Sequence, residues 1–420
     1  MAPTRFRNGE EAARRFGPAL VTRLAAGLDE TDPLGDAVVL AGRALPGGGR
    51  QALNAWLDGD SPESSPLHEL LEPLAEVPDW VDWRRIDRAC VAYWRGGYWT
   101  PLALNCAALA AGYRSGAGVK PLTFTGRLVS MAYRRQQETA RWAVAATRPG
   151  GLRRHAPGFK ETIRVRIVHA TVRRRILASG RWEAGHWGAP INLTDTAYGI
   201  AGEFSTVPVA AMRDAGLHYS RTERDDIQHL WRYVGHLLGL PDGDLLAVDE
   251  EQARTMMAVK DLTDTPADAD SRALVHALIE HGAPPDLLVP APLVRLAGMA
   301  IPPILYGVTR HWAGAEVADE LEIPDTPLKY LIPLLRPAVR ATDLLRRLGL
   351  RDDARIAART LARAHALLEV GHAPAGVVAA AEAGATIQPR DAQLAPQPPL
   401  APRTDPEQAD LERDPSIRSG

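Results

Sequence analysis

The sequence predicts an all-α protein built as a single large helical domain. Apolar residues recur every three to four positions over most of its 420 residues, whereas the apolar–polar alternation of strands is scarce. Candidate helix caps and prolines separate these periodic stretches. The sequence also lacks a Walker-type phosphate loop and a dinucleotide-binding fingerprint, which accompany parallel sheets.

The first third of the chain is expected to be helical. Asn8 is a candidate N-cap of a helix that extends to about Gly27. Asp32, followed by Pro33, is a candidate N-cap of the next helix, which the glycines at 47–49 should end. Further helical segments are expected at 49–59, 67–77 and 86–111.

A helix over about 128–146 carries a polar pair on an apolar face. Arg135 and Thr139 lie one turn apart at the middle of that face. A buried arginine needs a polar or anionic partner, and the adjacent Glu138 could neutralise Arg135 in a plain salt bridge. A structural pair and a polar site that lines a cavity are both open at this point.

The next helix, at 162–176, has a single histidine in an apolar stripe. Arg166 and Arg173 lie three positions before and four positions after His169, on the same side of the helix. Such a group could hold a ligand that combines a metal with carboxylates, as haem does. In the alternative interpretation, His169 is a core histidine bonded to a carbonyl and the arginines pair with protein carboxylates.

Helices are also expected in the rest of the chain. A helix capped by Thr194 or Asp195 should extend to Phe204, and one capped by Thr222 should end at Gly239. The remaining helices are expected at 250–262, 268–281, 315–321 and 337–368.

The composition is that of an ordinary globular protein. Hydrophobic residues make up 45% of the chain, charged residues 24%, and the formal net charge of −2 gives no indication of a nucleic-acid partner. Cys90 and Cys106 are the only cysteines, which excludes a thiolate-rich metal site and predicts two buried free thiols.

The sequence gives no sign of a transmembrane span. The first 17 residues lack the apolar core of a signal peptide, and no 18-residue run is free of charges and prolines. We therefore expect a cytoplasmic protein. The segment 287–308 is apolar but contains Arg295 and four prolines, so a buried hairpin and peripheral contact with a membrane surface are both open.

Two Glu-x-x-His motifs raise the alternative of a di-iron carboxylate site. They run from Glu183 to His186 and from Glu369 to His372. Both contain a glycine, which disfavours the regular helix that such sites require. A di-iron site at these motifs is therefore a weaker hypothesis than a haem bound by His169.

Three motifs follow one another in order: R-x-x-x-T from Arg135 to Thr139, R-x-x-H from Arg166 to His169, and W-G-x-P-x-N-x-x-D from Trp187 to Asp195. Their order and spacing resemble the rubber oxygenase or latex-clearing protein family. That family lies within a wider set of ER-bound oxygenases that includes the oxygenase of mycophenolic acid biosynthesis. The similarity extends from about residue 30 to 345.

The resemblance implies a globin-like helical core that binds one haem b. It assigns the iron ligand to His169 and cofactor binding also to Arg166. Arg135 and Thr139 match the family's polar residues on the other side of the haem, and with Glu138 they form the predicted catalytic set. The implied activity is oxygenation of a hydrophobic, alkene- or isoprenoid-like substrate with O₂. The alternative is a non-catalytic protein that binds haem or an apolar ligand as a sensor or carrier.

The sequence departs from the pattern of the rubber-cleaving proteins in two respects. Glu138 occupies the position of a family lysine, and no acidic residue in the stretch before Arg127 matches the family's distal glutamate. Those enzymes are usually exported, so rubber itself is not the expected substrate here. We expect an N-terminal helical extension at 1–30, an oxygenase-like catalytic domain at 31–387 and a disordered, proline-rich tail at 388–420.

Overall fold

The computed structural model describes residues 2–45, 48–61, 65, 67–124, 128–281 and 301–370. All regular elements of these residues are helices, which confirms the predicted fold class. The described helices belong to one unit, Met1–Gly371. The predicted tail at 388–420 lies outside the described residues.

The N-terminal segment forms two helices rather than the single one expected. The first helices of the chain are α1 (Gly9–Phe16), α2 (Pro18–Ala26) and α3 (Pro33–Arg43). Gly17, with φ +94°, separates α1 from α2. Asn8 occupies the N-cap position of α1 as predicted, but its side chain makes no capping hydrogen bond and its amide donates to the carbonyl of Leu262 at 2.9 Å. Asp32 caps α3 as predicted and accepts a hydrogen bond from the Gly35 amide at 3.1 Å.

The expected helical segment at 86–111 is interrupted. The elements of this part are α4 (Gly49–Asp58), α5 (His68–Leu71), the 3₁₀ helix η1 (Glu72–Ala75), α6 (Trp83–Trp94), α7 (Trp99–Ala103), the π-helix η2 (Leu104–Leu109), α8 (Ala110–Tyr113) and α9 (Lys120–Thr123). Gly97, with φ +62°, lies in the turn between α6 and α7. The expected single segment is therefore two, and the second contains a π-helix.

The middle of the chain supplies the helices around the candidate site. They are α10 (Leu128–Ala146), α11 (Pro157–Ala178), α12 (Ala184–Trp187), α13 (Leu193–Tyr198), the π-helix η3 (Gly199–Thr206), α14 (Val207–Asp214), α15 (Arg221–Leu237), α16 (Glu250–Thr263) and α17 (Ala269–His281). Asn192 caps α13, so the predicted caps Thr194 and Asp195 are wrong. Ser220 caps α15 in a capping box, two residues before the predicted Thr222.

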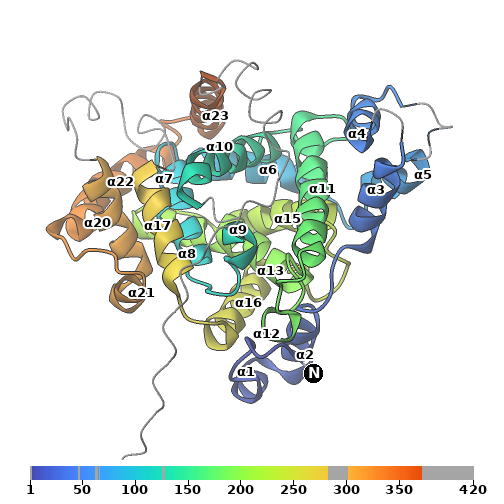
Figure 1. Cartoon of the computed structure of the whole chain (residues 1–420). Helices are drawn as coiled ribbons and strands as arrows, with labels where there is room; N and C mark the ends of the chain where they lie inside the picture. The colour runs from blue at the N-terminus through green and yellow to red at the C-terminus, as the bar shows by residue number, and fades with distance from the viewer. Residues whose placement is uncertain are drawn as a thin grey trace, which may run out of the picture. The chain divides into compact units, whose positions relative to one another are not determined.

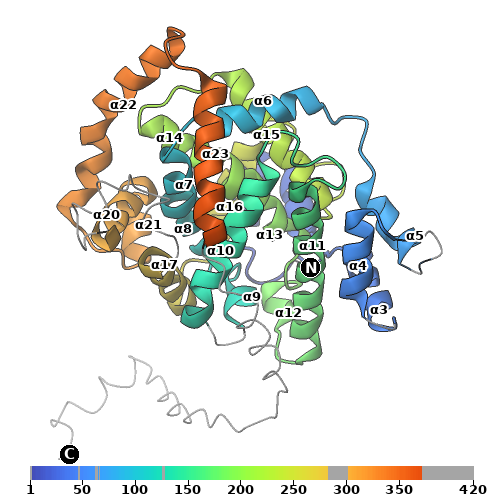
Figure 2. The same ribbon diagram turned by 90° about the horizontal axis from the view of Figure 1, so that it is seen from above.

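Of the C-terminal helices of the described residues, the first ones lie together at the left of Figure 1, whereas the last lies apart from them, above α10. These C-terminal helices are α20 (Ile301–Ala313), α21 (Ala315–Glu320), the 3₁₀ helix η4 (Pro327–Tyr330), α22 (Leu331–Arg347) and α23 (Asp353–Val370). The sequence predicts a helix that begins at Pro337, but Pro337 lies inside α22. In Figure 2, α23 lies across α10, against which it packs.

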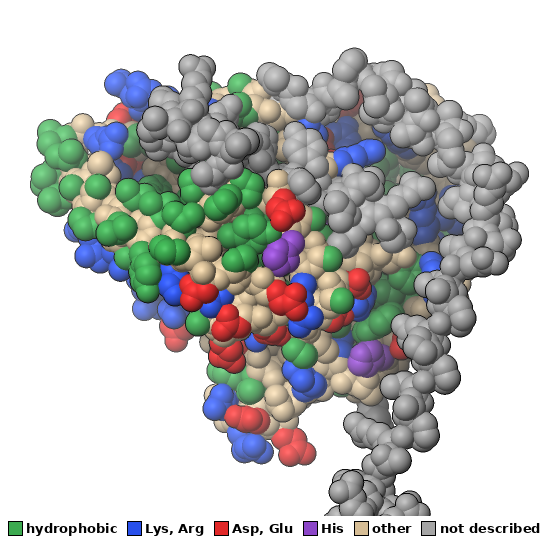
Figure 3. All heavy atoms as spheres, turned by 60° about the vertical axis from the view of Figure 1, so that its left-hand side comes forward, with side chains coloured by type: hydrophobic (Ala, Val, Ile, Leu, Met, Phe, Trp, Pro, Cys, Tyr) green, Lys and Arg blue, Asp and Glu red, His purple; other side chains and the backbone are tan. Residues whose placement is uncertain are grey.

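The face that carries α20, α21 and α22 exposes hydrophobic side chains (Figure 3). Six of its exposed leucines belong to α22 and the residues just after it: Leu334, Leu335, Leu344, Leu345, Leu348 and Leu350. Among the described residues, no helix has both the length and the apolarity that crossing a membrane requires. Most of the apolar segment 287–308 lies outside the described residues.

The main core lies between α6, α10 and α15, and aromatic rings fill it. Trp142 of α10 and Trp231 of α15 both contact Phe204 of η3, with ring centroids 5.0 Å apart in each pair. Cys90 and Cys106 are buried free thiols, as predicted. The core thus connects η3 to the helices on either side of it.

Two contacts fix α10 against α11. The indole of Trp142 donates to the Thr162 hydroxyl at 3.0 Å. A Cβ on Gly158 would lie 2.4 Å from the carbonyl oxygen of Ala145, so only glycine allows the first turn of α11 to approach the backbone of α10. This close packing places the predicted site residues of the two helices near each other.

Candidate functional site

A cavity of about 430 Å³ lies among α10, α11, η3 and α17. Four of the predicted site residues line it: Arg135, Glu138 and Thr139 from α10, and His169 from α11. The fifth, Arg166, is not among the lining residues. The rest of the lining is mainly apolar and includes valines of α11 and aromatic rings of the core. The cavity therefore brings together residues that are more than thirty positions apart in the sequence.

His169 faces this cavity with its imidazole unpaired. Among the described residues, neither ring nitrogen has a hydrogen-bond partner. Burial lowers the pKa of His169 from 6.5 to about 4; the nearby charge of Arg173 acts in the same direction and Asp32 opposes it. The ring is therefore neutral at pH 7, with a lone pair available toward the cavity. The bond to a backbone carbonyl that a core histidine would make is not present among these residues.

The two arginines that flank His169 are paired with carboxylates. Arg166 binds Asp32 through two hydrogen bonds, Nε–Oδ2 at 2.6 Å and Nη2–Oδ1 at 2.7 Å, and both side chains are buried. Arg173 binds Asp36 at 2.9 Å and is also buried. This pairing agrees with the structural interpretation of the arginines. It fixes α11 against the first turn of α3 and thereby sets the position of His169.

The polar residues of α10 occupy different parts of the cavity. Arg135 is half-buried and donates from Nη1 to the carbonyl of Leu122. Glu138 is exposed and pairs with Arg134 at 2.8 Å, so it does not neutralise Arg135. Thr139 is half-buried and lies one turn after Arg135. Arg135 and Thr139 thus face inward, and Glu138 lies where the cavity meets solvent.

Glu203 of η3 also lines the cavity, although the motif analysis did not select it. A Cβ on Gly112 would lie 2.2 Å from the carboxyl carbon of Glu203, so the end of the Glu203 side chain packs closely on the backbone of Gly112. Burial raises the pKa of Glu203 from 4.5 to about 7; Lys260 opposes this shift, and the charges of Asp195 and Asp264 add to it.

The sequence does carry a signal for Glu203. It is the only charged residue between Asp195 and Arg213, in an otherwise apolar and small-residue stretch. A lone acid in such a stretch is costly to bury and therefore marks a functional candidate. The structure adds that the stretch is π-helical, a geometry frequent at functional sites.

Two of these charged groups, Glu203 and Arg135, influence the phenol of Tyr113. Its buried hydroxyl has a raised pKa, mainly because of burial; the negative charge of Glu203 adds to the shift and the positive charge of Arg135 opposes it. Both charges therefore act on one phenol, and all three side chains line the cavity. The cavity has a polar corner in an otherwise apolar interior.

The described residues contain no group of three or more His, Cys, Asp and Glu side chains placed to hold a metal ion. Of the two Glu-x-x-His motifs, the first ends at His186, whose Nδ1 lies 2.6 Å from the hydroxyl of Thr4 at the exposed surface. The second extends to His372, outside the described residues. A haem needs only one ligand from the protein, and His169 could provide it.

Comparisons with known proteins agree on one group. Residues 94–347 match the family described as "ER-bound oxygenase mpaB/B'/Rubber oxygenase, catalytic domain". A rubber oxygenase of Streptomyces sp. (strain K30) is 24% identical over 304 residues, which cover 69% of this chain and 67% of that protein. The solved structure of latex clearing protein LCP in the closed state has a similar fold, with a TM-score of 0.52 and 20% identity, and the match covers 79% of this chain and 88% of the other. The family match includes all five predicted site residues and Glu203.

Proposed function

Because this chain belongs to the family of ER-bound oxygenases of the mpaB/B' type and rubber oxygenases, we propose that it is a haem b-dependent oxygenase that acts on a hydrophobic, isoprenoid-like substrate with O₂. The family makes the protein an oxidoreductase. The haem, the substrate class and the residue roles are our proposal. The observation that carries it is the unpaired, neutral imidazole of His169, which faces a largely apolar cavity.

The cavity fits a haem in its chemistry. Its volume of about 430 Å³ lies in the range of roughly 300–1,000 Å³ that cofactor and ligand sites occupy. His169 would supply a nitrogen ligand to the iron. Val165 and Val172 lie one turn before and about one turn after it on the same helix, and both line the cavity, where they would pack against the apolar macrocycle. Arg166 would contribute by holding α11 in place through Asp32.

The haem would supply the binding and activation of O₂. Arg135 would act as a charged hydrogen-bond donor toward oxygen, since one of its nitrogens is fixed on the Leu122 carbonyl and its guanidinium has further donors. Thr139 would add a hydroxyl one turn away. Glu138, exposed at the edge of the cavity, would exchange protons with solvent. The apolar lining would exclude water and bind a hydrocarbon chain.

Purified protein reconstituted with haemin is expected to show a Soret band and to consume O₂ when an isoprenoid alkene is added. An absorption spectrum tests the first step, and an oxygen electrode with a panel of alkenes tests the second. A protein that stays colourless after reconstitution would contradict the haem proposal. A haem protein that binds O₂ reversibly without consuming it would instead support the sensor or carrier alternative. A cytoplasmic location and contact with a membrane surface remain predictions from the sequence.

Arg135→Ala is expected to retain haem but to lose about 10²–10³-fold in turnover, the usual effect of removing a donor that stabilises developing negative charge. Oxygen uptake per haem measures this loss. Arg141→Ala is a matched control, because Arg141 is also on α10 but donates to the carbonyl of Leu368 and does not line the cavity. Equal turnover in Arg135→Ala and wild type would remove Arg135 from the catalytic set.

A further inference from the structure

We propose that Glu203 is the residue that exchanges protons with the contents of the cavity, and that Lys260 connects it to a polar surface pocket from which the protons come. The catalytic use of this route rests on the proposed oxygenase function. The route itself is argued from the positions of the two residues and of the charges around them.

The position of Glu203 suits an internal proton donor and acceptor. Glu203 lines the cavity, and its carboxyl group packs closely on the backbone of Gly112. Its ordinary pKa of 4.5 is raised to about 7, so both protonation states are populated at neutral pH. Glu138, in contrast, is exposed to solvent and pairs with Arg134.

Lys260 of α16 lies between two spaces. It lines the large cavity together with Glu203, and it also lines a separate polar pocket of about 60 Å³. That volume exceeds the roughly 10–15 Å³ that one water molecule needs. Because Lys260 is buried, its ammonium group can donate hydrogen bonds only to groups in these two spaces and to the protein around it. It is therefore placed to bind water near Glu203.

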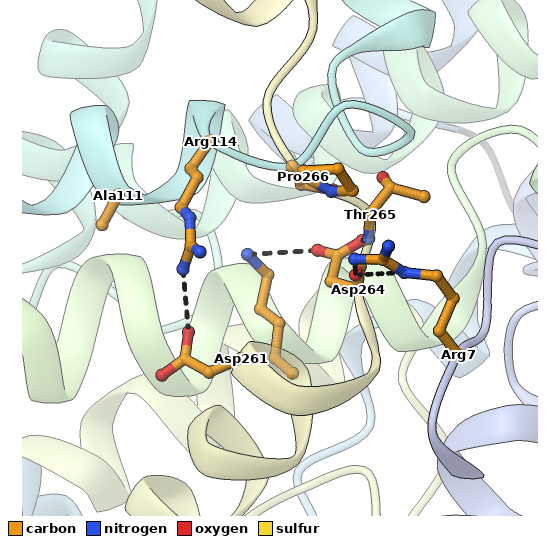
Figure 4. A pocket seen from close by; sticks show the side chains of 9 residues that line it. Arg7, Ala111, Arg114, Asp261, Asp264, Thr265 and Pro266 are labelled. Atoms are coloured by element: carbon orange, nitrogen blue, oxygen red, sulfur yellow. Dashed lines mark hydrogen bonds and ion pairs between the residues drawn. The ribbon is translucent and has the colours of Figure 1, made fainter. Parts of the chain in front are cut away.

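Charged side chains surround the surface pocket (Figure 4). Arg114 and Asp261 lie on one side of it, with their charged ends 3.9 Å apart, and Asp261 is exposed. On the other side, Asp264 accepts a hydrogen bond from Arg7 through its backbone carbonyl at 2.9 Å. The carboxylate of Asp264 lies 3.5 Å from the ammonium of Lys260. The pocket thus joins a solvent-exposed acid to the buried lysine.

The charges that act on Glu203 come from several elements. Arg135 of α10 and Tyr113 of α8 share the polar corner of the cavity with it. Lys260, which lines both spaces, lowers the pKa of Glu203, whereas Asp195 of the cavity and Asp264 of the surface pocket raise it. Arg5 forms ion pairs with both Asp195, at 2.7 Å, and Asp264, at 3.4 Å. Its positive charge therefore partly balances the negative charge of these two carboxylates.

The proposed step is a proton transfer without movement of electrons into or out of the protein. The O–H bond of protonated Glu203 breaks as its proton passes to an oxygen atom in the cavity. The carboxylate then regains a proton from a water molecule bound at Lys260, and that water is re-protonated from solvent through the surface pocket. The reverse sequence removes a proton from the cavity.

The titration of Glu203 in the haem-free protein tests this inference independently of the cofactor. Infrared difference spectra of the full-length chain are expected to show a carboxyl group that titrates near pH 7 and is lost in Glu203→Gln. In Lys260→Met, the same titration should move to higher pH, because the cation that stabilises the carboxylate is removed. Lys260→Arg should keep it near the wild-type position, and Glu251→Gln, an exposed acid on the same helix, should not change it.

In the haem-loaded enzyme, Glu203→Gln should lower turnover by about 10²–10⁴-fold while the Soret band is retained. It should also remove the dependence of turnover on a group with a pKa near 7. Persistence of the carboxyl titration in Glu203→Gln, or an unchanged titration in Lys260→Met, would overturn the inference. Failure of the wild type to bind haem would overturn the proposed function instead and would leave the titration result standing.

Discussion

His169→Ala is expected to abolish haem binding and to leave the fold intact. Because His169 makes no hydrogen bond with the described residues, its truncation leaves no buried partner unsatisfied. Its removal should therefore change the free energy of unfolding of the haem-free protein at pH 7 by only about 1 kcal/mol. The proposed haem, in contrast, would lose the nitrogen ligand that holds its iron. Reconstitution followed by gel filtration should recover a Soret band from wild type and none from the variant.

Two further measurements separate ligand loss from general damage. Imidazole added to His169→Ala should restore part of the Soret band, since it can enter the cavity in place of the side chain. His186→Ala should retain haem in full, because His186 contacts Thr4 at the exposed surface. Full haem retention in His169→Ala, or loss in His186→Ala, would show that the iron is bound elsewhere.

His169 also gives the haem-free protein a pH dependence with a defined sign. The unfolded chain binds a proton at this residue below pH 6.5, whereas the native state binds it only near pH 4. Stability therefore falls as the pH decreases from about 6.5 to 4. In His169→Ala this contribution is absent, so the loss of stability over this pH range should be smaller than in wild type.

Helical periodicity, a local property, was sufficient to place the histidine on an apolar helix face, whereas its predicted role as iron ligand came from the family resemblance. His169, Arg135 and Thr139 fall on the inner faces of regular helices, and the structure shows them lining one cavity. The partners of the arginines could not be found in this way. Arg166 pairs with Asp32, which lies 134 positions away and had been identified only as a helix cap. Such pairs depend on how different helices pack together, and the spacing of residues along one helix gives no information about this packing.

Glu203 was missed for a related reason. The motif search looked for an acid before Arg127, at the place where the family pattern has one, whereas this chain has its buried acid on η3. A π-helix departs from the 3.6-residue period, so face assignments based on that period fail there. Two helix boundaries also differ from the prediction. Gly17 divides the N-terminal segment into two helices, and Asn192 rather than Thr194 or Asp195 caps α13.

Asp32→Asn is expected to destabilise the haem-free protein by about 3–5 kcal/mol, the usual effect of removing one partner of a buried ion pair. The carboxylate of Asp32 accepts two hydrogen bonds from Arg166, and both side chains are less than a tenth exposed. Asparagine remains a good N-cap, so the change acts on the charge rather than on α3. Gly239 packs closely on this pair, since a Cβ on it would lie 2.8 Å from the carboxyl carbon of Asp32. Urea unfolding at pH 7 measures the difference.

Glu30→Gln is the matched control, because Glu30 forms a similar two-point pair with Arg23 at the surface. Its replacement should cost at most about 1 kcal/mol. The double variant Asp32→Asn/Arg166→Met should recover much of the stability, since it also removes the unpaired charge. If Arg166 acts by holding α11, this double variant should still bind haem through His169. If it folds but loses haem, Arg166 contacts the cofactor itself, as its position in the family motif predicts.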